Sequence, residues 1–132
     1  MAVIVESEQP TLYTKLGGHE GILDFLKPFY EDIRQHEILG PIFNAKIHDW
    51  DRHLDKITEF WALQTGGPTK YNGGFAAAHL RIGAKEEHFQ HWLALWEYNC
   101  KRQLPDDLSK QMIALAHEFA NRLKRVIRTY SR

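Results

Sequence analysis

The sequence predicts an all-α protein. Apolar residues recur every three or four positions in four segments, which is the period of an amphipathic helix. Stretches that contain glycine or proline separate these segments, and no stretch alternates with the period of two that a half-buried strand shows. The chain has 132 residues, 43% of them hydrophobic, which is enough for one ordinary core. We therefore expect a single helical domain over residues 11–132, after a flexible segment over residues 1–10.

The first predicted helix spans residues 19–36 and follows the breaker KLGGHEG, in which Gly17 and Gly18 predict a tight turn. Pro28 lies inside the helical pattern, so we expect a kink or a weakened hydrogen-bond ladder there. The apolar stripe of this helix consists of Ile22, Phe25, Leu26, Phe29, Tyr30 and Ile33.

Residues 39–64 predict two further helical pieces. Gly40 and Pro41 mark a turn, and a short helical piece follows it up to residue 47. A longer helix is predicted over residues 48–64, with Asp49 as its N-cap. Its apolar stripe and the face that overlaps it consist of Trp50, His53, Leu54, Ile57, Phe60 and Trp61.

Two long helices complete the chain. The first spans residues 85–103, and its buried side consists of Phe89, Trp92, Leu93, Trp96 and Cys100. LPDD breaks this helix, and Asp106 and Asp107 are predicted to cap the next one, over residues 108–130. The buried face of that last helix consists of Met112, Leu115, Ala116, Phe119, Leu123, Val126 and Ile127.

The segment FAAAHLRIG at 75–83 carries an unusual histidine. Three small alanines leave room beside His79, and the hydrophobic residues that follow it suggest a dry setting. We predict that His79 is either hydrogen-bonded in the core or bound to something large and flat against the alanine surface. The glycine-rich loop at 65–74 lies between His53 and His79 and would let one fold over the other. A cofactor clamped between them, with Tyr30 arriving from a third helix, is the arrangement that this order favours.

Composition excludes several classes of function. Seventeen basic and seventeen acidic side chains cancel, so no global field attracts nucleic acid or a membrane. No apolar run approaches the roughly 20 residues that span a bilayer, and no basic segment precedes the short apolar stretch of MAVIVESEQP, as a signal peptide would require. The single cysteine, Cys100, excludes an internal disulfide and suits a reducing cytoplasm. We expect a soluble cytoplasmic protein.

Other interpretations of these residues remain open. His88 and His91 have a spacing that suits one metal ion, but no carboxylate completes the set, so a zinc hydrolase is not favoured. Basic residues at the C-terminus suit a phosphate-binding or nucleic-acid-binding strip, or the macrodipole of the last helix, and we favour the macrodipole; they are Arg122, Lys124, Arg125, Arg128 and Arg132. A tyrosine on an apolar stripe, or a lone buried histidine, is usually part of the core. A helical interaction module without a cofactor is therefore the main alternative.

Three runs resemble the truncated haemoglobins, and most closely their group III: LGPIFNAKIHDWDRHLDKITEFW, YNGGFAAAH and HFQHWLALW. The resemblance covers about residues 12–130, with the motifs in order at matching separations. It implies a two-over-two helical sandwich around haem b, iron protoporphyrin IX. One departure is the glycine pairs Gly17-Gly18 and Gly66-Gly67, which are typical of groups I and II rather than group III.

The resemblance also implies roles for single residues. His79 corresponds to the proximal iron ligand, Tyr30 to the distal tyrosine, and His53 to the first position of the distal helix. Trp92 corresponds to the tryptophan that faces the bound ligand. The remaining haem contacts implied are Phe43, Lys56, Ile57, Phe60, Trp61, Tyr71, Phe75 and Arg81, of which Lys56, Tyr71 and Arg81 are assigned to the propionates.

The function implied is reversible binding of O₂, NO or CO at the haem iron. Tyr30 and Trp92 are expected to donate hydrogen bonds to the bound gas, and His53 to stand beside them. Several donors in one distal pocket favour NO dioxygenation or peroxide chemistry as a second activity, with an unidentified reductase as partner. We also expect His53 or Tyr30 to bind the iron when no gas is present.

Overall fold

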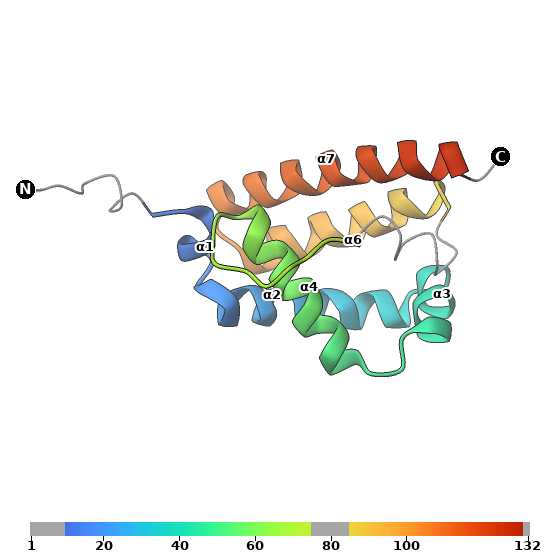
Figure 1. Ribbon diagram of the computed structural model, residues 1–132, viewed down its shortest axis with the longest axis horizontal. Helices are drawn as coiled ribbons and strands as arrows, with labels where there is room; N and C mark the ends of the chain where they lie inside the picture. The colour runs from blue at the N-terminus through green and yellow to red at the C-terminus, as the bar shows by residue number, and fades with distance from the viewer. Residues whose placement is uncertain (1–9, 75–84, 131–132) are drawn as a thin grey trace, which may run out of the picture.

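The computed structural model describes residues 10–74 and 85–130. Over these residues the chain forms helices and no strand, in agreement with the predicted class. The helices are α1 (Leu12–Lys15), α2 (Gly18–Gln35), α3 (Leu39–Lys46), α4 (Trp50–Gln64), α6 (His88–Gln103) and α7 (Asp106–Tyr130). Figure 1 shows α6 and α7 side by side along one edge, while α4 packs on α2, which also contacts α6. The pairs α2/α4 and α6/α7 form the two-over-two sandwich.

The turn between α1 and α2 depends on glycine. Gly17 has φ +99° and Gly18 has φ +71°, in the left-handed region where side chains are strained. A β-carbon on Gly21 would lie 1.9 Å from the carbonyl oxygen of Leu16, so α2 starts in close contact with the end of α1. The predicted tight turn at Gly17 and Gly18 is confirmed.

Helix α2 runs without interruption through Pro28. Its six predicted stripe residues are all buried, because their spacing puts them on one face. The stripe therefore decides which side of α2 meets the core, and the proline does not end the helix.

The turn predicted at Gly40 and Pro41 is wrong, since both residues lie in the first turn of α3. Proline is tolerated there because the first backbone N–H groups of a helix have no acceptor within it. His36 supports this start: its Nδ1 accepts the backbone N–H groups of Ile38 and Leu39, each at 3.1 Å.

The ends of the later helices differ in detail from the prediction. Asp49 caps α4 as predicted, and its carboxylate accepts the backbone N–H of Arg52 at 3.1 Å. Helix α6 starts at His88 rather than at residue 85, because the imidazole of His88 accepts the Lys85 N–H at 2.9 Å in a preceding turn. Asp106 and Asp107 belong to the first turn of α7, where acidic groups favour the positive end of the helix dipole.

A stack of three indoles lies in the core. Trp96 is fully buried, and its ring lies nearly parallel to Trp61 at 4.7 Å and to Trp92 at 5.1 Å, between ring centroids. Its Nε1–H donates to the carbonyl oxygen of Met112 at 3.0 Å, which joins α6 to α7. The stack therefore connects α4 to the α6/α7 pair. No helix among the described residues is long and apolar enough to cross a membrane.

Candidate functional site

An aromatic cluster gathers on the inner sides of α2, α3 and α4. The ring of Tyr30 lies 6.4 Å from Phe43, 6.0 Å from Trp50 and 5.9 Å from His53, between centroids. The Tyr30 and His53 rings are perpendicular, and Trp50 packs edge-on against His53 at 5.4 Å. Three helices thus bring the predicted residues Tyr30, Phe43 and His53 together.

Tyr30 and Trp92 are joined directly. The indole of Trp92 is a donor only, and it donates a hydrogen bond to the Tyr30 hydroxyl. Burial raises the pKa of the Tyr30 phenol well above its ordinary value, and the bond from Trp92 opposes that rise only in part. The hydroxyl is therefore a neutral donor held between α2 and α6.

The face of α4 next to this cluster is the one that the sequence predicted. Phe60 and Trp61 are buried and Ile57 is half-buried, whereas Lys56 is exposed. His53 and Ile57 lie on the same side of the helix as Phe60, because they are four and three positions apart. This side of α4 therefore combines one polar ring with apolar side chains.

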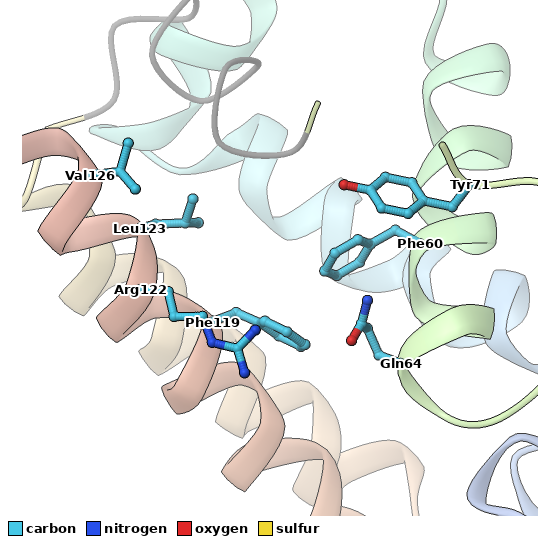
Figure 2. Close-up of a pocket in the computed structure, with 7 residues that line it drawn as sticks. All are labelled: Phe60, Gln64, Tyr71, Phe119, Arg122, Leu123 and Val126. Atoms are coloured by element: carbon cyan, nitrogen blue, oxygen red, sulfur yellow. The ribbon is translucent and has the colours of Figure 1, made fainter. Parts of the chain in front are cut away.

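A cavity of about 350 Å³ opens between α4, the segment after it and α7. Figure 2 shows side chains from both sides converging on it: Phe60, Gln64, Tyr71, Phe119, Arg122, Leu123 and Val126. The rings of Tyr71 and Phe119 each pack against Phe60, at 5.3 and 5.2 Å between centroids. Most of this lining is apolar or aromatic, with polar groups at Gln64, Arg122 and Tyr71. Such walls suit a flat, apolar ligand that carries a few acidic groups.

Some of these lining residues were not predicted as contacts. Phe119, Leu123 and Val126 were predicted only as the buried face of the last helix, and Arg122 only as a cation near its end. The sequence did carry a sign of these contacts. The last helix is longer than α6, and its apolar stripe continues past residue 119, so the far end of the stripe can face something other than α6. Gln64 carried no such signal.

Three predicted site residues, Phe75, His79 and Arg81, lie outside the described residues. Of the two histidines considered for zinc, His91 packs against the ring of His36 at 5.3 Å, and burial is the main cause that lowers the pKa of His88. Among residues 10–74 and 85–130, no group of three His, Cys, Asp or Glu side chains is placed to hold a metal ion.

The comparisons with known proteins agree with this geometry. The profile of the bacterial-like globins matches residues 11–124. The chain belongs to the bacterial-like globin family. It is 30% identical over 116 residues to the group 3 truncated hemoglobin ctb of Campylobacter jejuni, covering 84% of this chain and 91% of that protein. It is 29% identical over 85 residues to the group 1 truncated hemoglobin GlbN of Mycolicibacterium paratuberculosis, covering 64% of this chain and 61% of that protein.

Solved structures of truncated hemoglobins have the same fold as this globin. The crystal structure of the group III truncated hemoglobin from Campylobacter jejuni matches with a TM-score of 0.77 at 31% identity, covering 83% of this chain and 90% of that one. The 2/2 hemoglobin from Synechococcus, at 19% identity, matches with the same TM-score over 88% of this globin and 99% of that chain. The prediction of a truncated globin near group III is confirmed.

Membership of this family makes the chain a haem globin that binds small gaseous ligands at iron. The described residues fit that cofactor: an apolar cavity lies beside α4, and the neutral hydroxyl of Tyr30 is buried in the aromatic cluster of α2, α3 and α4. Haem is itself a flat, apolar ring system with two acidic side chains. Family membership and this fit both favour the globin over the alternative of a helical module without a cofactor.

Proposed function

We propose that this globin holds haem b through His79 and binds O₂, NO or CO reversibly beneath the side chains of Tyr30, Trp92 and His53. In this proposal Phe43, Ile57, Phe60, Trp61 and Phe75 contact the porphyrin. Lys56, Tyr71 and Arg81 accompany its propionates, and the exposed cation of Lys56 and the half-buried phenol of Tyr71 agree with such a role. When bound, the haem supplies an iron atom with one open coordination position for the gas.

The observation that carries the proposal is the hydrogen bond from Trp92 to Tyr30. The indole N–H occupies one lone pair of the phenol oxygen, so the phenol's own proton is left to donate elsewhere. This neutral donor would stabilise the negative charge that a gas gains when it binds at the iron. Trp92 therefore acts on the gas through Tyr30.

The size of this effect decides between oxygen delivery and oxygen chemistry. One hydrogen bond of about 1–3 kcal/mol slows dissociation of the gas by roughly one to two orders of magnitude. Such slow dissociation of the gas favours a protein that reacts with its bound oxygen over one that carries oxygen and releases it elsewhere. NO dioxygenation or peroxide reduction is the second activity that we propose, and a reductase is the partner that would return electrons to the iron.

The empty ligand position has two internal candidates, His53 and Tyr30. Burial raises the pKa of the Tyr30 phenol, which opposes the phenolate form that binds ferric iron. An imidazole binds iron in its neutral form, so it needs no buried negative charge. We propose that His53, rather than Tyr30, approaches the iron when no gas is bound.

The absorption spectrum of the purified protein tests the proposal. We expect a Soret band in the ferric protein that shifts when dithionite and then CO are added. His79→Ala should lose most of the band at equal protein concentration, whereas His48→Ala, which changes an exposed histidine ahead of α4, should keep it. A colourless chain after hemin is supplied, or full haem retention by His79→Ala, would contradict the proposal.

A further inference from the structure

The hydroxyl of Tyr13 lies at one end of a hydrogen-bonded chain outside the distal cluster. Its oxygen is 2.5 Å from Nδ1 of His19 and also accepts the backbone N–H of His19 at 3.2 Å. A carboxylate only accepts, so Nε2 of His19, which faces Glu59, carries the proton of the neutral imidazole, and Nδ1 accepts the proton of the phenol. Nε2 of His19 lies 3.1 Å from a carboxylate oxygen of Glu59. Phenol, imidazole and carboxylate therefore form one proton path from α1 through α2 to α4.

This arrangement favours loss of an electron from Tyr13. A phenol that loses an electron becomes a strong acid, so its oxidation is easier where a base already holds the proton. Imidazole is such a base, and the Glu59 carboxylate stabilises the imidazolium that results. Among the other described tyrosines, Tyr98 differs clearly: 54% of it is exposed, and the guanidinium of Arg102 lies 4.9 Å from its ring centroid. A cation over the ring disfavours removal of an electron.

A route of stacked indoles followed by backbone hydrogen bonds leads from the distal cluster to Tyr13. Trp92, which donates to Tyr30, stacks on Trp96, and Trp96 stacks on Trp61. From Trp61 two backbone hydrogen bonds continue the route through one residue: the carbonyl of Trp61 accepts the N–H of Thr65 at 3.1 Å, and the carbonyl of Thr65 accepts the N–H of Tyr13 at 2.9 Å. Stacked indoles and short hydrogen bonds are good media for electron transfer.

We propose that Tyr13 is a redox-active tyrosine, which gives an electron by way of Trp61 and the indoles stacked on it to a peroxide-oxidised haem and is reduced again by small phenolic or enediol molecules at the surface. This inference rests on the proposed haem site. Hydrogen peroxide would take up two electrons, together with two protons from solvent, as its O–O bond breaks, and would leave as two waters. One electron would come from the haem and one from Tyr13, whose phenol proton would move to Nδ1 of His19. One molecule of surface reductant would then return an electron to the Tyr13 radical while His19 returns the proton, and a second molecule would restore the haem by way of Tyr13; each reductant molecule would release one proton to solvent.

Electron paramagnetic resonance of the ferric protein, frozen after mixing with hydrogen peroxide, tests the proposal. We expect a tyrosyl signal that Tyr13→Phe removes and that Tyr98→Phe leaves unchanged. His19→Gln should lower it too, because no base then takes the phenol proton. Circular dichroism and the Soret band identify any variant that has lost its fold or its haem.

A second experiment separates failure of this inference from failure of the haem site. A ruthenium(III) polypyridyl complex generated by a light flash oxidises side chains whether or not haem is present. In the chain as purified we expect the radical on Tyr13 in preference to Tyr98, and a loss of that preference in His19→Gln that added imidazole restores, which a merely structural role of His19 would not predict. A missing Soret band would contradict the proposed function alone, because the flash experiment still decides the role of Tyr13. A peroxide-induced radical that persists in Tyr13→Phe, or a flash-induced radical without preference for Tyr13, would overturn the inference.

Discussion

The indole N–H of Trp92 on α6 donates to the hydroxyl of Tyr30 on α2, so the two polar groups predicted to meet the gas are already bonded to each other. They therefore act as a unit rather than as two independent donors. Effects of residues that share one hydrogen bond are not additive. This coupling leads to the first prediction.

Tyr30→Phe should release O₂ about 10- to 100-fold faster than the unaltered protein, because it removes a hydrogen bond of about 1–3 kcal/mol. Trp92→Phe should have a smaller effect, since it frees the Tyr30 hydroxyl without removing it. In the double variant the loss of Trp92 should add almost nothing. Stopped-flow dissociation of O₂ measures all three, and unchanged rates in both single variants would end the stabilisation account.

Acid should weaken the contact between α4 and the segment that follows it. The backbone N–H of Lys70 is the main cause that lowers the pKa of Glu59 below its ordinary value of 4.5, and His19 adds to it. The unfolded chain therefore binds a proton that the folded chain does not, so this stabilisation is present above pH 4.5 and is lost as the pH falls through the lower, folded pKa.

Glu59→Gln should flatten the fall of the free energy of unfolding below pH 4.5, since the variant has no carboxylate to protonate at this position. Urea unfolding at a series of pH values provides the measurement. Glu118→Gln is the matched control, because its carboxylate is exposed and makes only a 4.0 Å ion pair with Arg122. An equal flattening in both variants would show that the effect is general rather than specific to Glu59.

The thiol of Cys100 should resist modification in the folded protein. Burial, and after it the charge of Glu97, raises the pKa of this thiol to about 12, and its exposed fraction is 0%. The reactive thiolate is therefore nearly absent at neutral pH. We expect a thiol reagent to label Cys100 only at the rate of unfolding, with rapid labelling in urea as the control; fast labelling of the native chain would contradict this.

Gly67→Ala should destabilise the protein through Tyr13. A β-carbon at position 67 would lie 2.3 Å from Cδ1 of the Tyr13 ring, and forcing extra atoms into such a contact costs about 1–3 kcal/mol. Thermal unfolding of Gly67→Ala, Tyr13→Ala and the double variant forms a cycle. Once the ring is absent, the alanine at position 67 should cost little, whereas an equal cost in both backgrounds would exclude the ring as the cause.

The amphipathic helices could be predicted because they depend on local spacing. The stripe from Ile22 to Ile33 is buried as a whole, and Asp49 caps α4 because its side chain reaches an N–H only three residues away. The start of α3 was missed for a similar local reason. Gly40 and Pro41 usually signal a turn, but the imidazole of His36 accepts the N–H groups that precede them, and the helix starts earlier.

The sequence alone determined the helical class, the inward faces of α2 and α4, and through its motifs the resemblance to truncated haemoglobins. Only the tertiary structure decided that Trp92 donates to Tyr30, that three indoles stack, and that Tyr13, His19 and Glu59 share one proton path. The physical reason is range. Helical periodicity follows from interactions between residues three or four positions apart, and the stacking of Trp92 on Trp96 within α6 is of this kind. The other contacts join side chains from different helices, whose distances depend on how the whole core packs.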